Sequence, residues 1–292
     1  MRPFFFTFGL TKKLITMNKI LVSFSGGRTS AFMAKLIQEH PTYKDYQKLF
    51  VYANTGKEAE ATLEFIDKCD KEFNLNLVWV EADVVHEKQK GTQYTITNFK
   101  DAKRKGEPFT EVVKKYGLPS KLYRHCTREL KEIPIGKYAR DILGKDYVTA
   151  IGIRADEKHR LGNDPKKVYP LAELGIDEQI VRNFWDRQPF DLELKDYQGN
   201  CDLCFLKSVR KKLTIIKENP KVADWWLDLE VNNIEEGRPM LDVYRNLSMD
   251  DLINMAKNPF RKAIDQHELR QQQSNLFDID LDLEFDCFCK MN

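Results

Sequence analysis

The sequence predicts an α/β fold in which helices cover both faces of a Rossmann-like parallel sheet, followed by a helical C-terminal part. Short apolar runs alternate with segments of helical periodicity in the first half, and the links between them are short. From about Ile176 onward the periodicity is helical alone. Strand–helix–strand units of this kind have right-handed crossovers, and their ligands bind beyond the carboxyl ends of the strands.

The elements follow from these patterns in chain order. Strands are predicted at residues 20–22, 49–53, 77–80 and 147–153, and helices at 30–40 and 58–73. Residues 86–123 are polar and rich in lysine. We expect a solvated loop there with one short helix at 109–116, and a lid or a nucleic-acid contact is the alternative.

The C-terminal part is predicted to be mostly helical. Helices are expected at 177–187, 203–218, 222–230 and 249–257. Trp225 and Trp226 are interpreted as core of this part, with a base-stacking platform as the alternative. Residues 278–286 alternate acidic and apolar side chains, a strand-like period of two. Such an edge strand would bring Cys287 and Cys289 to a defined place.

Composition sets limits on the class of protein. A chain of 292 residues with 42% hydrophobic and 32% charged residues can bury a core and is too balanced for a disordered protein. The net charge of +2 argues neither for nor against a polyanionic partner. The longest uncharged stretches fall short of the ~20 apolar residues of a membrane span, so we expect no membrane association.

The N-terminus is a poor signal peptide, because its short apolar run stops at Lys12 and Lys13 and lacks a small-residue cleavage site. We therefore expect a cytoplasmic protein. Met17 leads directly into the first strand, so residues 1–16 are interpreted as an extension before the natural start, with a short packing arm as the alternative. The predicted division is this extension, a nucleotide-binding domain at 17–175 and a helical, cysteine-bearing region at 176–292.

The first strand runs into a glycine-rich segment, Ser23-Phe24-Ser25-Gly26-Gly27-Arg28-Thr29-Ser30, which opens a helix. Two adjacent glycines let successive N–H groups converge on an anion, and the helix N-terminus adds about half a positive charge. The hydroxyls and the guanidinium of this segment can donate further hydrogen bonds. It matches neither the triphosphate loop ending in Gly-Lys-Ser/Thr nor the three-glycine dinucleotide motif. We interpret it as a phosphate cradle, with a plain tight corner as the alternative.

Several motifs resemble one known superfamily. Ser25-Gly26-Gly27-x-x-Ser30 resembles the pyrophosphate loop (PP-loop) of ATP pyrophosphatases and adenine nucleotide alpha hydrolases. Asn54-Thr55-Gly56 is similar to a segment that lies beside the nucleotide in the phosphoadenosine phosphosulfate (PAPS) reductase superfamily. The segments 126–131, 152–157 and 199–207 resemble a bacterial and phage branch of that superfamily, related to DNA-phosphorothioating and tRNA-thiolating enzymes. The resemblance covers about residues 18–230 and implies an adenine nucleotide alpha hydrolase-like fold.

Two departures from the family pattern affect the expected substrate. Thr29 stands where the ATP-using loop usually carries Asp, so one contact to Mg²⁺ is missing. Dedicated sulfonucleotide reductases typically lose the Gly-Gly pair, whereas this chain keeps Gly26 and Gly27. That favours ATP, cleaved between its α and β phosphates. The reductases' Glu-Cys-Gly-like tail is also absent, although Cys287 or Cys289 remains a candidate analogue.

Four of the six cysteines form two close pairs, Cys201/Cys204 and Cys287/Cys289. In a chain without an export signal, such pairs indicate metal or cluster ligands rather than disulfides. In the cluster-bearing relatives an upstream Cys-Cys pair joins a Cys-x-x-Cys, and here His125-Cys126 stands in the matching place. The resemblance therefore implies a [4Fe-4S] cluster held by Cys126, Cys201, Cys204 and Cys289 (or Cys287). The alternatives are His125 as fourth ligand, a site left open for sulfur, Zn²⁺ or free thiols.

Charged residues after the fourth strand complete the predicted site. Arg154 and Arg160 suit phosphate oxygens, and Asp156 suits Mg²⁺; a surface salt-bridge cluster is the alternative. Arg128 and Lys131 are three residues apart and are expected to face the pocket beside Cys126, with a solvated helix face as the alternative. The expected catalytic residues are Arg28, Arg154 and Asp156. The expected nucleotide contacts are Ser23, Ser25, Gly26, Gly27, Arg28, Thr29, Ser30, Asn54, Thr55, Gly56, Gly152, Arg154 and Arg160.

Together these patterns predict an adenylating sulfurtransferase that uses ATP, Mg²⁺ and a cysteine-bound cluster. The expected partners are a nucleotide, a tRNA or DNA acceptor, and sulfide or a sulfur donor protein; a homodimer is also expected. A reductase that releases sulfite from phosphoadenylyl or adenylyl sulfate is the second hypothesis. A non-catalytic nucleotide- or nucleic-acid-binding module with structural zinc is the third.

Overall fold

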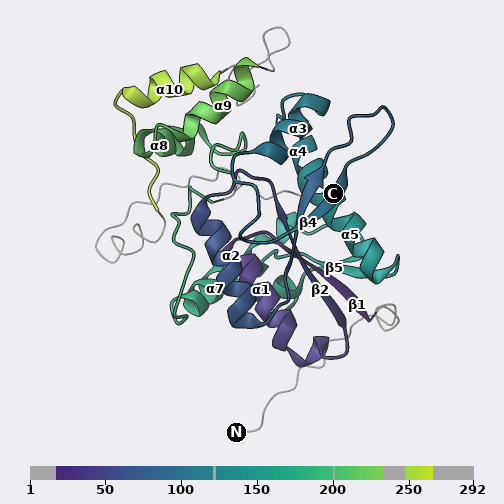
Figure 1. The fold of residues 1–292 in the computed structure, drawn as a ribbon. Helices are drawn as coiled ribbons and strands as arrows, with labels where there is room; N and C mark the ends of the chain where they lie inside the picture. Colours follow the sequence, from purple (N-terminus) through teal and green to yellow (C-terminus); the bar gives the residue numbers. More distant parts are fainter. Residues whose placement is uncertain (1–17, 121–122, 200, 233–246, 266–292) are drawn as a thin grey trace, which may run out of the picture.

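The computed structural model describes residues 18–120, 123–199, 201–232 and 247–265 (Figure 1). Its centre is a six-stranded sheet of order β4-β3-β2-β1-β5-β6. The strands are β1 (Lys19–Phe24), β2 (Gln47–Asn54), β3 (Val78–Asp83), β4 (Gln93–Thr97), β5 (Val148–Ala150) and β6 (Lys167–Val168). Every neighbouring pair is parallel except β3 and β4. The predicted α/β class is confirmed, although the sheet is mixed rather than wholly parallel.

Strand β4 corrects the sequence prediction, because it lies inside the stretch expected to be a solvated loop. It runs antiparallel to β3, with Asp83 opposite Gln93. As an edge strand it keeps most side chains exposed, and Ile96 is 62% exposed. No apolar run therefore marks it, and the remaining signal is its aromatic and β-branched content from Tyr94 to Thr97.

Helices cover both faces of the sheet, as predicted. One face packs against α1 (Arg28–Glu39), α2 (Glu60–Phe73) and α7 (Glu178–Trp185), and the other against α5 (Ile133–Leu143) (Figure 1). Because side chains alternate along a strand, neighbouring residues of β1 enter different cores: Val22 faces α1 and Leu21 faces α5. Cys69, a residue of α2, is fully buried in the core between α2 and the sheet.

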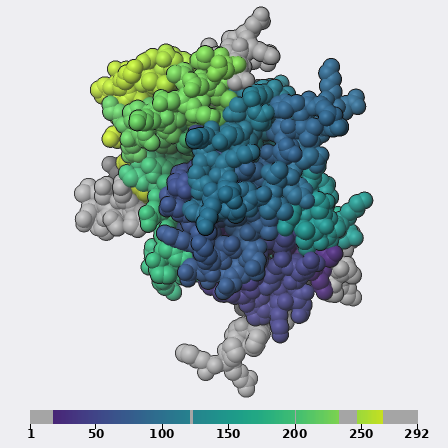
Figure 2. Space-filling view, viewed as in Figure 1, coloured from purple at the N-terminus to yellow at the C-terminus, as the bar shows by residue number. Residues whose placement is uncertain are grey.

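The remaining long helices share a second core, and they lie at one end of the molecule (Figure 2). They are α3 (Glu107–Tyr116), α8 (Val209–Glu218), α9 (Val222–Val231) and α10 (Met249–Lys257). Trp226 is completely buried there, which confirms its predicted core role, whereas Trp225 is only partly buried against the same core. The helix expected at 203–218 begins only at Val209, because the Ser208 side chain caps it by accepting a hydrogen bond from Lys211 N.

Short elements connect these parts. They are η1 (Pro41–Tyr43), α4 (His125–Thr127), η2 (Arg128–Glu132), η3 (Ala155–Arg160) and α6 (Pro170–Glu173). Within the described ranges, no helix is long and apolar enough to cross a bilayer. The predicted strand at 278–286, Cys287, Cys289 and residues 1–16 lie outside the described residues.

We predict that Trp185 is a major source of stability. Its ring lies 4.9 Å from that of Phe65, and its Nε1 donates to the Arg28 carbonyl at 3.0 Å. Trp185→Ala should lower the free energy of unfolding by about 3–5 kcal/mol, because it leaves a cavity. Trp185→Phe keeps most of the volume and should cost only about 1–2 kcal/mol. Urea denaturation measures both; equal losses would contradict the packing role.

Candidate functional site

The predicted phosphate loop lies where the strand order reverses. Strand β1 pairs with β2 on one side and with β5 on the other, and ligands of such sheets bind at this point. The loop follows β1, and the segment after β5 reaches it. A Cβ on Gly152 would lie 3.5 Å from Ser30 Cα, and Arg154 Nη1 donates to Thr29 Oγ1 at 3.5 Å. The structure thus brings two distant predicted segments together.

The loop is held by its own hydroxyls. Ser30 Oγ accepts from Ser25 N at 3.2 Å, contacts Ser25 Oγ at 2.9 Å and donates to the Gly27 carbonyl at 2.9 Å. Gly27 is the N-cap of α1, and no described side chain caps that helix or adds an acid to its first turn. The N-terminal N–H groups of α1 therefore remain available to an external acceptor, and the helix dipole favours an anion.

Arg28 does not point to this loop in the structure. Its Nε donates to Asp191 at 2.7 Å, and its Nη2 donates to the Leu192 carbonyl at 2.5 Å. Arg28 therefore connects the first turn of α1 to the segment after α7. The sequence pattern did not predict that Asp191 would bind Arg28. The guanidinium is thus engaged away from the phosphate cradle in this structure, while the backbone N–H of Arg28 stays in the first turn of α1. Its predicted roles in phosphate binding and catalysis stay predictions.

The charged residues after β5 form a network. Arg154 Nη2 lies 2.9 Å from Asp156, 3.9 Å from Glu157 and 3.7 Å from Glu178. Burial opposes the charge of Arg154, yet these acids raise its pKa above the ordinary value. Burial likewise opposes the charge of Asp156, but the guanidinium holds its pKa below the ordinary value. Arg160 pairs with Glu157 at 2.5 Å. The predicted residues are neighbours, and Asp156 is engaged by Arg154.

The turn after β2 carries the Asn-Thr-Gly segment. Asn54 is fully buried, and its side-chain amide donates to Glu81 at 2.7 Å and to the Lys103 carbonyl at 2.8 Å. Thr55 is also fully buried, and its hydroxyl donates to Glu58 at 2.8 Å. Asn54 therefore fixes the turn to the sheet. Thr55 faces the second predicted site, the cysteines.

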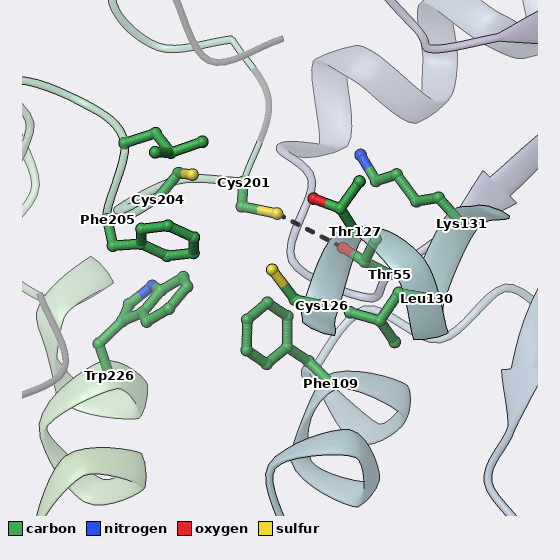
Figure 3. A pocket seen from close by; sticks show the side chains of 11 residues that line it. Thr55, Phe109, Cys126, Thr127, Leu130, Lys131, Cys201, Cys204, Phe205 and Trp226 are labelled. Atoms are coloured by element: carbon green, nitrogen blue, oxygen red, sulfur yellow. Dashed lines mark hydrogen bonds between the residues drawn. The ribbon is translucent and has the colours of Figure 1, made fainter. Parts of the chain in front are cut away.

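Three cysteines line one pocket beside this turn (Figure 3). The Cys201 thiol points toward Thr55, with Sγ 3.6 Å from Thr55 Oγ1, and the Cys126 thiol points into the same pocket (Figure 3). Cys204 belongs to the same loop as Cys201. The remaining lining is mainly apolar: Phe109, Thr127, Leu130, Lys131, Phe205, Leu206 and Trp226. The structure thus assembles Cys126, Cys201 and Cys204 as predicted from segments far apart in the sequence.

Lys131 lines this pocket, whereas Arg128 is 59% exposed and pairs with Glu129. The reason is the π-helical turn η2, in which Ile133 N bonds the Arg128 carbonyl five residues earlier. In such a turn, residues three apart no longer lie above one another. Burial raises the pKa of the Cys201 thiol well above its ordinary value; the Glu58 carboxylate raises it further, and Lys131 lowers it.

The three cysteine thiols of this pocket can be compared with the ligands that a zinc ion or an iron–sulfur cluster requires. Within the described residues, no three His, Cys, Asp or Glu side chains converge on one metal ion. A cluster differs because its thiolates bind separate iron atoms, so they need not meet at one point. Three thiols around one largely apolar pocket fit a cluster better than a mononuclear zinc site. His125 does not line this pocket, and its Nε2 lies 2.9 Å from the Gly117 carbonyl.

Sequence reasoning missed the residues that join the two sites. Lys57 Nζ lies 3.1 Å from Asp202, the residue after Cys201, and Trp226 Nε1 donates to Asp202 at 2.6 Å. Glu58 pairs as an isolated β-bridge with Cys201. Lys57 and Glu58 directly follow Asn-Thr-Gly, and Asp202 lies between the paired cysteines. Their positions next to the two motifs could have marked these residues as candidates. Nothing in the sequence indicated that Lys57 would contact Asp202.

The fold and the loop define a nucleotide-binding α/β protein. A family model of the phosphoadenosine phosphosulfate reductase domain matches residues 19–114. An uncharacterized nin region protein of Escherichia phage lambda is 38% identical over 197 residues, covering 65% of this chain and 67% of its own length. The chain belongs to the phosphoadenosine phosphosulfate reductase-like superfamily.

Two uncharacterized proteins of Methanocaldococcus jannaschii are also similar. One is 25% identical over 236 residues, covering 75% of this chain and 44% of its own length. The other is 29% identical over 161 residues, covering 55% of this chain and 31% of its own. This chain therefore spans less than half the length of either archaeal relative.

We predict that the two loop glycines differ in tolerance. Gly26 has φ +82°, and a Cβ there would lie 2.8 Å from Thr62 Cγ2. Gly26→Ala should cost about 2 kcal/mol or more, because a left-handed conformation and a close contact both oppose it. Gly27 has extended backbone and open space, so Gly27→Ala should cost at most about 1 kcal/mol, because alanine is a poorer N-cap than glycine. Thermal unfolding of both variants distinguishes them; similar losses would contradict this loop geometry.

Proposed function

We propose that this chain is a cytosolic, ATP-using enzyme that adenylates an acceptor and then transfers sulfur to it. The observation that carries the proposal is the N-terminus of α1, which lies at the reversal of strand order without a described side-chain cap or first-turn acid. That is the local chemistry a departing pyrophosphate needs. The retained Gly26-Gly27 pair keeps the loop open to it.

The first step is nucleotidyl transfer. An oxygen of the acceptor forms a bond to the α-phosphorus of ATP while the bond from that phosphorus to the α–β bridging oxygen breaks, so pyrophosphate leaves. Backbone N–H groups of the loop and Arg154 would stabilise the charge on the leaving group. Mg²⁺ commonly binds phosphates together with one or two carboxylates, and Asp156 is the proposed protein ligand. A sulfur nucleophile then displaces AMP from the adenylated acceptor.

The cysteine pocket is the proposed place of sulfur delivery. Cys126, Cys201 and Cys204 would hold a [4Fe-4S] cluster, with Cys287 or Cys289 as the candidate fourth ligand. In the alternative without a fourth cysteine ligand, one iron would be open to a sulfur atom. The walls are mainly apolar, with Phe109 and Trp226 among them, and would limit the access of water, while Lys131 would supply a positive charge beside the thiols.

Reduction of a sulfonucleotide is the second candidate, and the family model that matches residues 19–114 favours it. In that reaction a cysteine thiolate attacks the sulfur of phosphoadenylyl or adenylyl sulfate, the nucleotide leaves, and a thiol reductant then releases sulfite. Cys287 or Cys289 is the proposed nucleophile. The nucleotide contacts would be shared with the first candidate, because both substrates carry an adenosine phosphate.

We predict that anaerobic protein with ATP, Mg²⁺ and sulfide yields AMP and pyrophosphate in the presence of an acceptor, and that Gly27→Asp abolishes this. Gly27→Asn is the matched control, because both side chains are good N-caps and only Asp repels phosphate. ATP affinity should be about tenfold lower for the Asp variant than for the Asn variant. Calorimetry measures binding, and chromatography measures the products.

Each outcome selects one hypothesis. Sulfite released from a sulfonucleotide without ATP consumption would replace the adenylation proposal with reduction. ATP bound tightly with no product from either substrate, across tRNA, DNA and small acceptors, would favour the non-catalytic module. Equal ATP affinity of the Asp and Asn variants would contradict the placement of phosphate at α1.

We also predict iron and acid-labile sulfide at about four each per chain in protein purified without oxygen. Cys126→Ser, Cys201→Ser and Cys204→Ser should each reduce both contents, because each removes one thiolate of the pocket. Cys69→Ser is the control, since this thiol is buried in the core of the sheet. Zinc at one equivalent without sulfide would contradict the cluster. Elemental analysis and the visible spectrum provide the measurement.

A further inference from the structure

We infer that Asp202 is a positioning residue that holds Cys201 against the turn after β2. Its carboxylate receives three donors. Lys57 Nζ lies 3.1 Å from Oδ2, while Trp226 Nε1 and Leu203 N donate to Oδ1 at 2.6 and 2.9 Å. These donors come from the turn after β2, from α9 and from the cysteine loop itself. Asp202 is therefore the point where three separate parts of the chain meet.

Backbone contacts align the same two segments. Asp202 N donates to the Lys57 carbonyl at 3.2 Å, and Glu58 forms an isolated antiparallel bridge with Cys201. As a result, Thr55 Oγ1 lies 3.6 Å from Cys201 Sγ, although the two residues are 146 positions apart. Thr55 and Glu58, which lie on either side of Lys57 in the chain, thus both contact Cys201. Any displacement of Lys57 relative to Asp202 would separate the thiol from this turn.

The surroundings of the ion pair make it stronger than a surface pair. The side chains of Lys57 and Asp202 are only 10% and 20% exposed. Lys57 Nζ also lies 4.5 Å from the centre of the Trp225 ring, which stabilises the cation. Removing the carboxylate charge leaves a shielded ammonium without its partner, which costs far more than loss of an exposed pair. Asp202 touches no reacting atom; it acts on Cys201 through Lys57 and Trp226.

The test is site-resolved alkylation of the full chain, as purified and after chelator treatment. Asp202→Asn can still accept hydrogen bonds from Trp226 and Leu203 but has no charge for Lys57. Labelling of Cys201 by iodoacetamide should become about tenfold faster in the chelated protein, because the loop opens more easily. Cys69 is fully buried in a different core, so its labelling reports global unfolding and should not change. Peptide mass spectrometry reads both thiols in one sample.

Two further variants sharpen the result. Asp67→Asn removes one carboxylate from the surface pair with Lys71 and should leave Cys201 labelling unchanged. Lys57→Met should accelerate it as Asp202→Asn does, and the double variant should be no faster than the faster single one, because both break the same pair. Additive effects, an unchanged Cys201 rate, or equal acceleration at Cys69 would overturn the inference. Asp202 would have this role whichever ligand the pocket holds, so failure of the ATP experiments leaves it standing.

Discussion

The ion pair between Lys57 and Asp202 joins the end of a sheet strand to a loop that carries two cysteines. The turn after β2 is anchored on its other side by Asn54, whose amide reaches Glu81 and the Lys103 carbonyl. The turn after β2 is thereby fixed both to the sheet and to the cysteine loop. The position of Cys201 depends on the sheet, because Thr55 and Glu58 on this turn contact Cys201 directly.

In the phosphate loop, too, side chains fix the backbone in place. Ser30 uses its hydroxyl within the loop, and Arg28 uses its guanidinium on Asp191 and the Leu192 carbonyl. These side chains fix the loop rather than extend from it. What remains to meet an anion is the backbone at the start of α1, with Arg154 reaching in from the segment after β5. A backbone cradle is rigid and recognises a phosphate by its charge and shape.

Local sequence was sufficient for elements whose apolar pattern is strong. Strands β1, β2 and β3 and helices α1, α2, α9 and α10 lie where the pattern predicted them, because each presents a buried face to a core. Strand β4 was missed because an edge strand with exposed side chains has no such pattern. The beginning of α8 was misplaced because Cys204 and Leu203 are buried in a turn, and burial alone resembles a helix face.

The sequence by itself determined the class of fold, the glycine loop after the first strand and the cysteines that share a pocket. Each depends on neighbours in the chain or on a motif that resembles one of a known superfamily. Tertiary structure alone decided that Arg28 binds Asp191, that η2 turns Arg128 away from Lys131, and that Lys57 meets Asp202. Contacts between residues so far apart depend on how the two cores pack, and periodicity along the chain carries no information about that packing.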